Sequence, residues 1–160
     1  MKKFDKLGLD LAELQGKIFE KSFKKYNCSS LVFLRRFKYS KVAMTFDNNS
    51  SNILLDSDYW LNELENEFGQ TNYGQIKFSE ETLFWMGYIY RYISYTREMT
   101  TKKAFSLISP KELAQHYYVY HTQSEEWVIQ RILDLKNKDE SFFDKNAYLK
   151  EKLRPRYKTC

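Results

Sequence analysis

The segment 83–96 constrains the fold more than any other part of the chain. Its fourteen residues are mostly aromatic or aliphatic, and Arg91 is the only charged one. At about 100° per residue, the large side chains cover every side of a helix, and a helix that is apolar all round is a buried one. The segment is shorter than the ~20 apolar residues that a membrane-spanning helix needs. We therefore expect a central helix, at about residues 79–97, inside a helical domain.

The composition favours an all-α fold with a single domain. The chain has 160 residues but only five glycines and two prolines, whereas β-sandwiches and barrels need frequent turn residues. A chain of this length can bury roughly 70% of the surface that its unfolded form exposes. No internal repeat or low-complexity tract divides the sequence. We expect one helical domain over residues 1–144 and a basic, mobile tail over residues 145–160.

Capping residues predict where the helices begin. A serine, threonine or aspartate before an apolar run accepts hydrogen bonds from the first free N–H groups of a helix. Ser109-Pro110 adds a proline at the first helical position, and Thr122 with Glu125 matches a capping box. The last helix is expected to present Val128, Ile129, Ile132 and Leu135 to the core. Together the signals predict six or seven helices. Five are expected at about residues 9–26, 30–46, 57–68, 79–97 and 100–107, and two more begin at about residues 110 and 125.

Charge is segregated along the first half of the chain. Residues 17–41 hold eight basic residues against Glu20 alone, whereas residues 47–68 hold six acidic residues and no basic one. The two blocks can pair with each other or stay solvated. Alternatively, the basic block is open to an acidic protein or to phosphates, which the net charge of +5 permits. A nucleic-acid face would then use Lys21, Lys24, Arg35, Lys38, Lys41, Arg154 and Arg156.

Two arginines, Arg36 and Arg91, fall on apolar faces of the predicted helices. A buried guanidinium must be paired, and one near the surface can extend towards water. One interpretation is an internal pair with a carboxylate of the 47–68 block. The other is that one of the two arginines binds a carboxylate or phosphate of a partner, because the planar guanidinium suits bidentate binding.

Tyrosine is abundant, with 13 residues in the chain. Its ring provides contact area and its hydroxyl one hydrogen bond, which suits protein interfaces. Tyr117, Tyr118 and Tyr120 lie too close together on one helix for all three to face inward, so at least one is expected at the surface. The predicted partner-binding residues are Arg36, Arg91, Tyr88, Tyr117 and Tyr118.

Catalytic and metal-binding patterns are missing from the sequence. It contains no GxxxxGK[ST] loop, GxSxG elbow or HExxH motif, so we expect neither an enzyme nor a bound cofactor. His116, His121, Cys28 and Cys160 are a poor metal set, because zinc wants three or four clustered ligands. His121 is expected to hydrogen-bond the local backbone. The N-terminus has no apolar run resembling a signal peptide, which predicts a cytoplasmic protein without a membrane partner.

Four segments carry a resemblance to a known family. They are Cys28-Ser29-Ser30 with Arg35-Arg36-Phe37, residues 84–92 (FWMGYIYRY), Tyr120-His121-Thr122, and residues 129–132 (IQRI). Over about residues 28–133 the chain resembles small bacterial proteins encoded in toxin–antitoxin-like loci, often near ADP-ribosyltransferase-like toxins. The resemblance implies an antitoxin-type role with a cognate toxin as the partner, and it assigns no functional residues.

Two functional hypotheses follow. An antitoxin-type protein would bind a cognate toxin and block its active site or substrate access by steric occlusion. The alternative is a nucleic-acid-binding protein that uses the basic 17–41 block and the C-terminal tail, and its affinity would fall steeply with salt. No helix-turn-helix signature supports this alternative. The sequence leaves the oligomeric state open.

Overall fold

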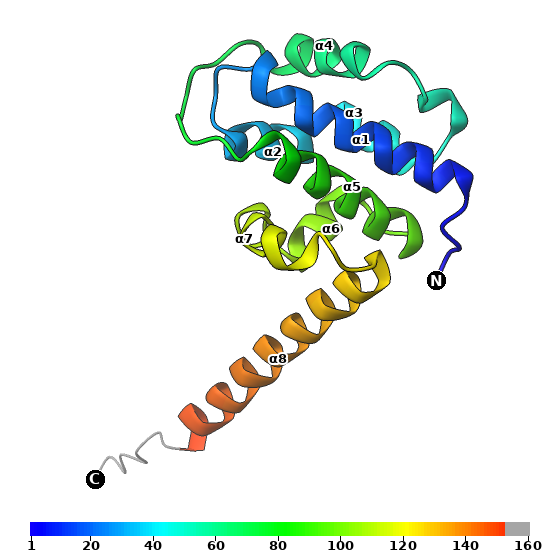
Figure 1. The fold of residues 1–160 in the computed structure, drawn as a ribbon. Helices are drawn as coiled ribbons and strands as arrows, with labels where there is room; N and C mark the ends of the chain where they lie inside the picture. Colours follow the sequence, from blue (N-terminus) through cyan, green and yellow to red (C-terminus); the bar gives the residue numbers. More distant parts are fainter. Residues whose placement is uncertain (153–160) are drawn as a thin grey trace.

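The computed structural model describes residues 1–152, except for the side chains of Phe142, Phe143, Tyr148 and residues 150–152. Within these residues the chain forms eight α-helices and one short 3-10 helix, with no β-strand, which confirms the all-α prediction (Figure 1). The helices are α1 (Lys6–Lys25), α2 (Ser30–Lys38), α3 (Lys41–Asp47), η1 (Ser51–Ile53), α4 (Ser57–Phe68), α5 (Glu80–Thr96), α6 (Thr101–Leu107), α7 (Pro110–Tyr120) and α8 (Glu125–Lys152).

Helix α5 is the central helix, as predicted. Ser79 caps it by accepting a hydrogen bond from the Thr82 N–H, and two glutamates follow in the first turn, where the helix dipole favours negative charge. Helix α1 packs along α5 so closely that the two backbones touch. A Cβ atom added at Gly87 would lie 2.6 Å from the Gln15 carbonyl oxygen. Glycine at this position is therefore a packing requirement.

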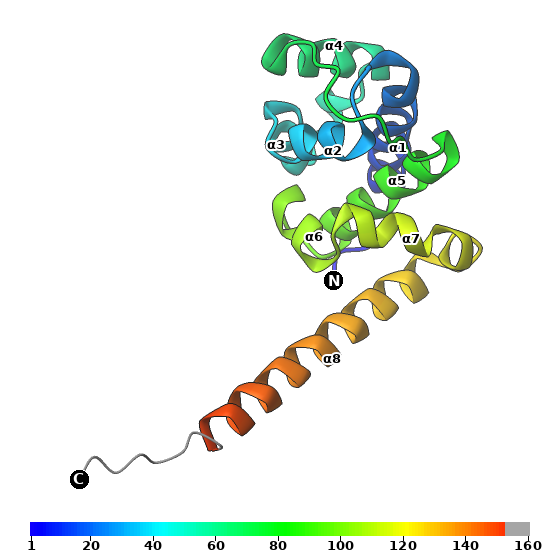
Figure 2. The same cartoon turned by 90° about the vertical axis from the view of Figure 1, so that its left-hand side faces the viewer.

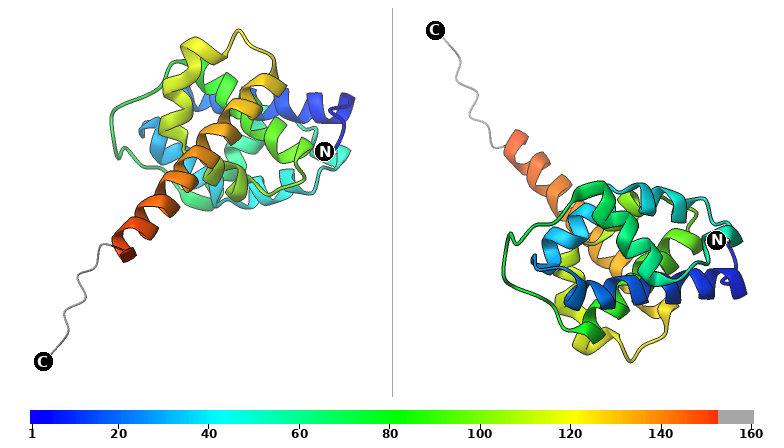
Figure 3. Two further views of the ribbon diagram at one scale, coloured as in Figure 1. Left: turned by 90° about the horizontal axis from the view of Figure 1, so that it is seen from below. Right: turned by 90° about the horizontal axis from the view of Figure 1, so that it is seen from above.

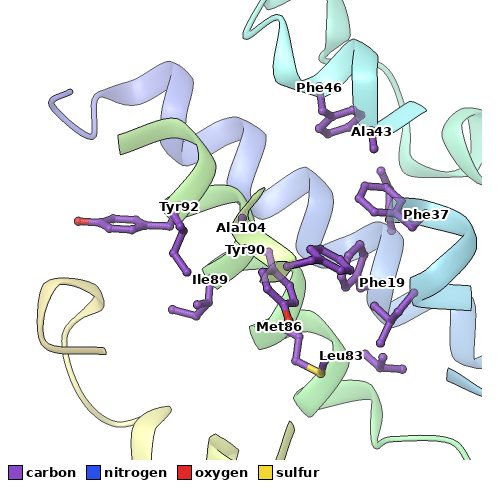
Figure 4. Packing of buried hydrophobic residues seen from close by; sticks show 14 of the residues in the cluster. Phe19, Phe37, Ala43, Phe46, Leu83, Met86, Ile89, Tyr90, Tyr92 and Ala104 are labelled. Atoms are coloured by element: carbon purple, nitrogen blue, oxygen red, sulfur yellow. The ribbon is translucent and has the colours of Figure 1, made fainter. Parts of the chain in front are cut away.

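The other helices are arranged around α5 in two groups. Helices α1 to α4 lie on one side of it, and α6 and α7 lie on the other (Figures 1 and 2). The core between α1, α2 and α5 is rich in aromatic rings. Phe19 and Phe37, for example, pack edge to face with their centroids 4.8 Å apart, near Leu83 and Met86 of α5 (Figure 4). Aromatic side chains thus supply much of the buried apolar surface.

The predicted helix over residues 30–46 is in fact two helices, α2 and α3. Ser40 interrupts it, because its side chain accepts a hydrogen bond from the Ala43 N–H at 2.9 Å and so caps α3. A serine side chain can compete in this way with the backbone bonds of a continuous helix. This break raises the number of α-helices among the described residues to eight, against the six or seven predicted.

Helices α7 and α8 begin where the sequence predicted. Ser109 caps α7 ahead of Pro110, whereas at α8 it is Ser124, not Thr122, whose side chain accepts from the Trp127 N–H. Val128, Ile129 and Ile132 are buried as predicted, but Leu135 is 37% exposed. The reason is that α8 leaves the body of the molecule near this point (Figures 1 and 3).

The predicted boundary between the domain and the tail, at residue 144, lies within α8. The helix continues to Lys152, so residues 145–152 are helical, and the division into domain and tail stays a prediction. The remainder of the predicted tail, including Arg154, Arg156 and Cys160, lies outside the described residues. Among the helices that the structure describes, none combines the length and the apolarity that crossing a membrane requires.

Candidate functional site

Arg91 is an internal structural residue. Its side chain is fully buried, and each of its three nitrogens has a partner: Nε donates to Gln15 at 2.9 Å, Nη1 to Asp47 at 3.0 Å and Nη2 to the Thr101 hydroxyl at 2.8 Å. Burial lowers the pKa of the guanidinium, and the Asp47 carboxylate opposes this effect. This position removes Arg91 from the predicted partner-binding set and supports the internal pair with the 47–68 block.

Arg36 is half-buried and contacts the end of α4. Its Nη1 donates to the Gly69 carbonyl oxygen at 2.8 Å, and its guanidinium carbon lies 5.6 Å from the centre of the Phe68 ring. Gly69 ends α4 with φ = 71°, a left-handed conformation that suits glycine. Arg36 therefore holds the end of α4 against α2, and it does not join the tyrosines described next.

Helices α5 and α7 together present an aromatic surface, which we define as Trp85, Tyr117, Tyr118 and His121. Tyr117 is its centre, with ring centroids 5.7 Å from Trp85, 5.5 Å from Tyr118 and 4.4 Å from His121. Tyr88 also lies on α5, but its ring packs near Phe4 and Phe84, with centroids 6.2 Å and 6.4 Å away. The structure thus brings together Tyr117 and Tyr118 of the five predicted partner-binding residues.

Local bonds keep the aromatic surface ordered. The His121 Nδ1 lies 2.7 Å from the Tyr117 carbonyl oxygen, which confirms that this histidine bonds the local backbone. The His121 ring also stacks on Tyr117 at an interplanar angle of 21°. Ordered side chains lose little conformational freedom when a partner binds.

One tyrosine of this surface, Tyr118, is strongly exposed. Its side chain is 81% exposed, although Tyr117 beside it is half-buried. Val119 is exposed next to it, and Trp127 of α8 is partly exposed and packs edge-on against Tyr120. The sequence did not indicate Trp85, Val119 or Trp127 as site residues. The positions of the two tryptophans depend on how α5 and α8 pack against α7, which no local pattern reveals.

Two of the five described residues of the predicted nucleic-acid face, Lys21 and Lys24, form internal ion pairs, and so does the neighbouring Lys25. Lys21 pairs with Asp58 at 3.1 Å, Lys24 with Glu80 at 3.5 Å and Lys25 with Glu65 at 3.4 Å. Two of these three acidic partners belong to the 47–68 block, so the interpretation that the two blocks face each other is confirmed on α1 and α4. Arg35 and Lys41 are exposed, and Lys38 is half-buried. Arg154 and Arg156 lie outside the described residues.

The described residues hold no group of three or more histidine, cysteine, aspartate or glutamate side chains placed to bind a metal ion. Cys28 is a free, buried cysteine. The aromatic surface is the main candidate site, and its side chains offer packed rings and exposed aromatic area to a partner. Comparison of the chain with family models, with curated proteins and with solved structures finds no match.

Proposed function

We propose that this chain is an antitoxin-type protein without catalytic activity, which acts in the cytoplasm by binding a cognate toxin and occluding it. The observation that carries the proposal is Tyr118, an aromatic side chain that is 81% exposed on an ordered aromatic surface. Tyrosine, tryptophan and arginine dominate the energetic hot spots of protein interfaces. An exposed tyrosine beside the packed Tyr117 and Trp85 rings has the character of such an anchor.

The size of an ordinary interface indicates how much of the molecule takes part. A stable complex buries ~1,600 Å² in total, about half of it on each partner. The aromatic surface with Val119 and Trp127 supplies the apolar centre, and the exposed polar residues Gln115, Thr122 and Gln123 supply a rim. This pattern of an aromatic centre with a polar rim is that of protein–protein interfaces.

The identity of the partner rests on the resemblance of residues 28–133 to proteins of toxin–antitoxin-like loci. A toxin would be blocked when the body of this protein covers its active site or its substrate entrance. Steric occlusion requires no chemistry from the antitoxin. It therefore agrees with a candidate site that consists of aromatic contact residues.

The test is co-expression with the protein encoded by the neighbouring gene, with bacterial growth and co-purification as readouts. The wild-type chain should restore growth and co-purify with the toxin in a fixed ratio. Tyr118→Ala should weaken binding about 30-fold, as expected for a hot-spot residue that contributes ~2 kcal/mol. Tyr73→Ala is the matched control, because Tyr73 is 76% exposed but lies in the loop between α4 and α5.

Two outcomes would contradict the proposal. Equal effects of Tyr118→Ala and Tyr73→Ala would show that the aromatic surface is not the binding site. A toxin that stays inactive, or has a changed mass, after release from the complex would show chemical modification instead of occlusion. The proposal requires the released toxin to regain its activity at its original mass.

A further inference from the structure

We propose a second binding site, for single-stranded nucleic acid, on a face formed by α2 and α6. This face, which we call the Tyr39 face, consists of Arg35, Lys38, Tyr39 and Lys102. It shares no residue with the aromatic surface, so the inference goes beyond the proposed function and does not depend on it. The ligand chemistry is a phosphodiester backbone with unpaired bases.

The first observation is that two lysines from distant parts of the chain meet at one tyrosine ring. The Lys38 Nζ lies 5.2 Å from the centre of the Tyr39 ring, and the Lys102 Nζ lies 5.3 Å from it. Lys38 is at the end of α2, whereas Lys102 is in the first turn of α6. Tyr39 is 53% exposed although both ammonium groups lie over its ring, so part of the tyrosine remains accessible to a ligand.

Arg35 extends the same cluster along α2. It precedes Tyr39 by four residues, a spacing that places two helical residues on one face, and it is exposed. The Tyr39 face thus has two lysines at one aromatic ring, and Arg35 lies one helical turn before that ring. Such a combination of backbone-binding cations with a stacking platform is what proteins use to hold single strands.

The second observation is that these cations have no internal counter-charge. Throughout the part of the chain that the structure describes, Arg35, Lys38 and Lys102 form no ion pair. Two carboxylates from the neighbouring α3–α4 region are already in use. Asp47 binds Arg91 and Thr101, and Glu67 accepts from the Lys41 N–H at 3.0 Å. The positive charge of the Tyr39 face is therefore left for an external anion.

The lysines of α1 show what the alternative arrangement looks like. Lys21 and Lys24 each have a carboxylate within 3.5 Å. Ion pairs of this kind neutralise a basic helix within the fold and leave little attraction for phosphate. Because the chain pairs the α1 lysines but not those of the Tyr39 face, the two sets provide a comparison at equal charge.

The composition of the Tyr39 face favours nucleic acid over an acidic protein. Lysine is depleted in protein–protein interfaces, whereas lysine and arginine clustered on one face are the electrostatic mark of nucleic-acid binding. The exposed ring favours a single strand over a duplex. Bases in a duplex are already stacked on each other, but an unpaired base can stack on tyrosine.

The test is fluorescence anisotropy of a labelled oligothymidylate, titrated with the full chain at several salt concentrations. Three phosphate contacts predict that log K falls with log salt at a slope of about −2, since each contact on a single strand adds about −0.7. By the same relation each contact is worth about fivefold at ~0.1 M salt. Lys38→Gln/Lys102→Gln should therefore weaken binding about 25-fold and reduce the slope by about 1.4.

The matched control is Lys21→Gln/Lys24→Gln, which removes the same net charge from the paired lysines of α1. It should weaken binding less than about threefold, because its lysines make no phosphate contact. Tyr39→Ala should weaken binding about tenfold through loss of stacking. Tyr59→Ala tests a tyrosine of similar exposure on α4 and should have no effect. Circular dichroism checks that each variant is folded.

Four results would overturn the inference. The first is no binding by the wild-type chain at low salt, and the second is equal weakening by the two double variants. The third is a combined result, in which a duplex binds as tightly as the single strand and Tyr39→Ala leaves the affinity unchanged. The fourth is displacement of the oligonucleotide by polyglutamate at equal charge concentration, which would assign the face to an acidic protein.

Discussion

Arg36 and Arg91 look alike in the sequence and differ sharply in the structure. Each lies on the apolar side of a helix, among aromatic neighbours. Arg91 is fully buried and bound to Asp47, Gln15 and Thr101. Arg36 is half-buried and bound to a backbone carbonyl at the end of α4. Arg91 thus joins helices that are distant in the sequence, whereas Arg36 binds the backbone at the end of a single helix.

The difference is one of solvent access and of available partners. A buried guanidinium needs a carboxylate, because transferring an unpaired charge from water to the interior is costly. A half-buried one keeps part of its hydration and needs only a carbonyl and an aromatic ring. The internal partners of Arg91 come from α1, α3 and α6, so its burial ties three elements to the central helix.

The largest effect that this comparison predicts is that of Arg91→Ala. Removing the guanidinium leaves Asp47 and Gln15 without their buried partner and opens space in the core. Breaking a buried ion pair in this way costs about 3–5 kcal/mol of the free energy of unfolding. Urea denaturation followed by circular dichroism measures it. A loss no larger than that of Arg36→Ala would refute the distinction between the two arginines.

A double-mutant cycle sharpens the comparison at the Arg91–Asp47 pair. Asp47→Ala alone removes the acceptor for Arg91 and for the Thr101 N–H and hydroxyl. The double variant Arg91→Ala/Asp47→Ala should be less destabilised than the sum of the single variants, with a coupling of about 2 kcal/mol, because neither partner is left buried alone. Additive losses would mean that the two side chains act independently.

The sequence predicts the local elements of this fold well and its long-range pairs less well. Ser109 marks the start of a helix by capping chemistry that acts over three residues, and this prediction holds. Ser40 was missed because its signal is also local but sits inside an apolar pattern that continues from α2 into α3. The break arises because the Ser40 side chain, and not a backbone carbonyl, accepts a hydrogen bond from the next turn. The spacing of apolar residues carries no information about this competition.

The candidate sites show the same limit. The sequence identifies Tyr117 and Tyr118 as surface candidates, because neighbouring positions on a helix cannot all face inward. It does not reveal that Trp85 packs on Tyr117, or that Lys102 meets Lys38 at Tyr39, because these contacts join residues from different helices. The segregated charges predict, as one of two options, that the basic 17–41 block pairs with the acidic 47–68 block. The packing of α1 on α4 shows that such pairs form.

An alkaline titration tests two tyrosines that follow Arg91 on α5, Tyr92 and Tyr95, with a smaller expected effect on stability. Burial, and then the hydrogen bonds to Glu126 and Asp5, raise the pKa of Tyr92 and of Tyr95 to about 12. An unfolded tyrosine has a pKa of about 10. The two protonated hydroxyls therefore contribute their full stabilisation to the folded protein below pH 10. As the pH rises, the tyrosines of the unfolded chain ionise first, so this contribution falls and is lost above about pH 12.

Denaturant midpoints measured from about pH 9 to about pH 12 check this prediction. The control is Tyr95→Phe, which removes one of the titrating hydroxyls and should make the loss with pH shallower. A stability that stays flat across this range would show that the two phenols ionise as easily in the folded protein as in the unfolded chain.

The smallest predicted effect is that of Arg36→Ala. It removes one hydrogen bond to the Gly69 carbonyl and the contact with Phe68, both near the surface, and should cost about 1 kcal/mol. Arg35→Ala is the matched control, because this arginine precedes Arg36 on α2 and is exposed. It should change the free energy of unfolding by less than ~0.5 kcal/mol. Since Arg36 lies apart from the aromatic surface, its loss should leave toxin affinity unchanged. A tenfold weaker complex would extend the binding surface to α2 and the end of α4, and would return Arg36 to the role that the sequence predicted for it.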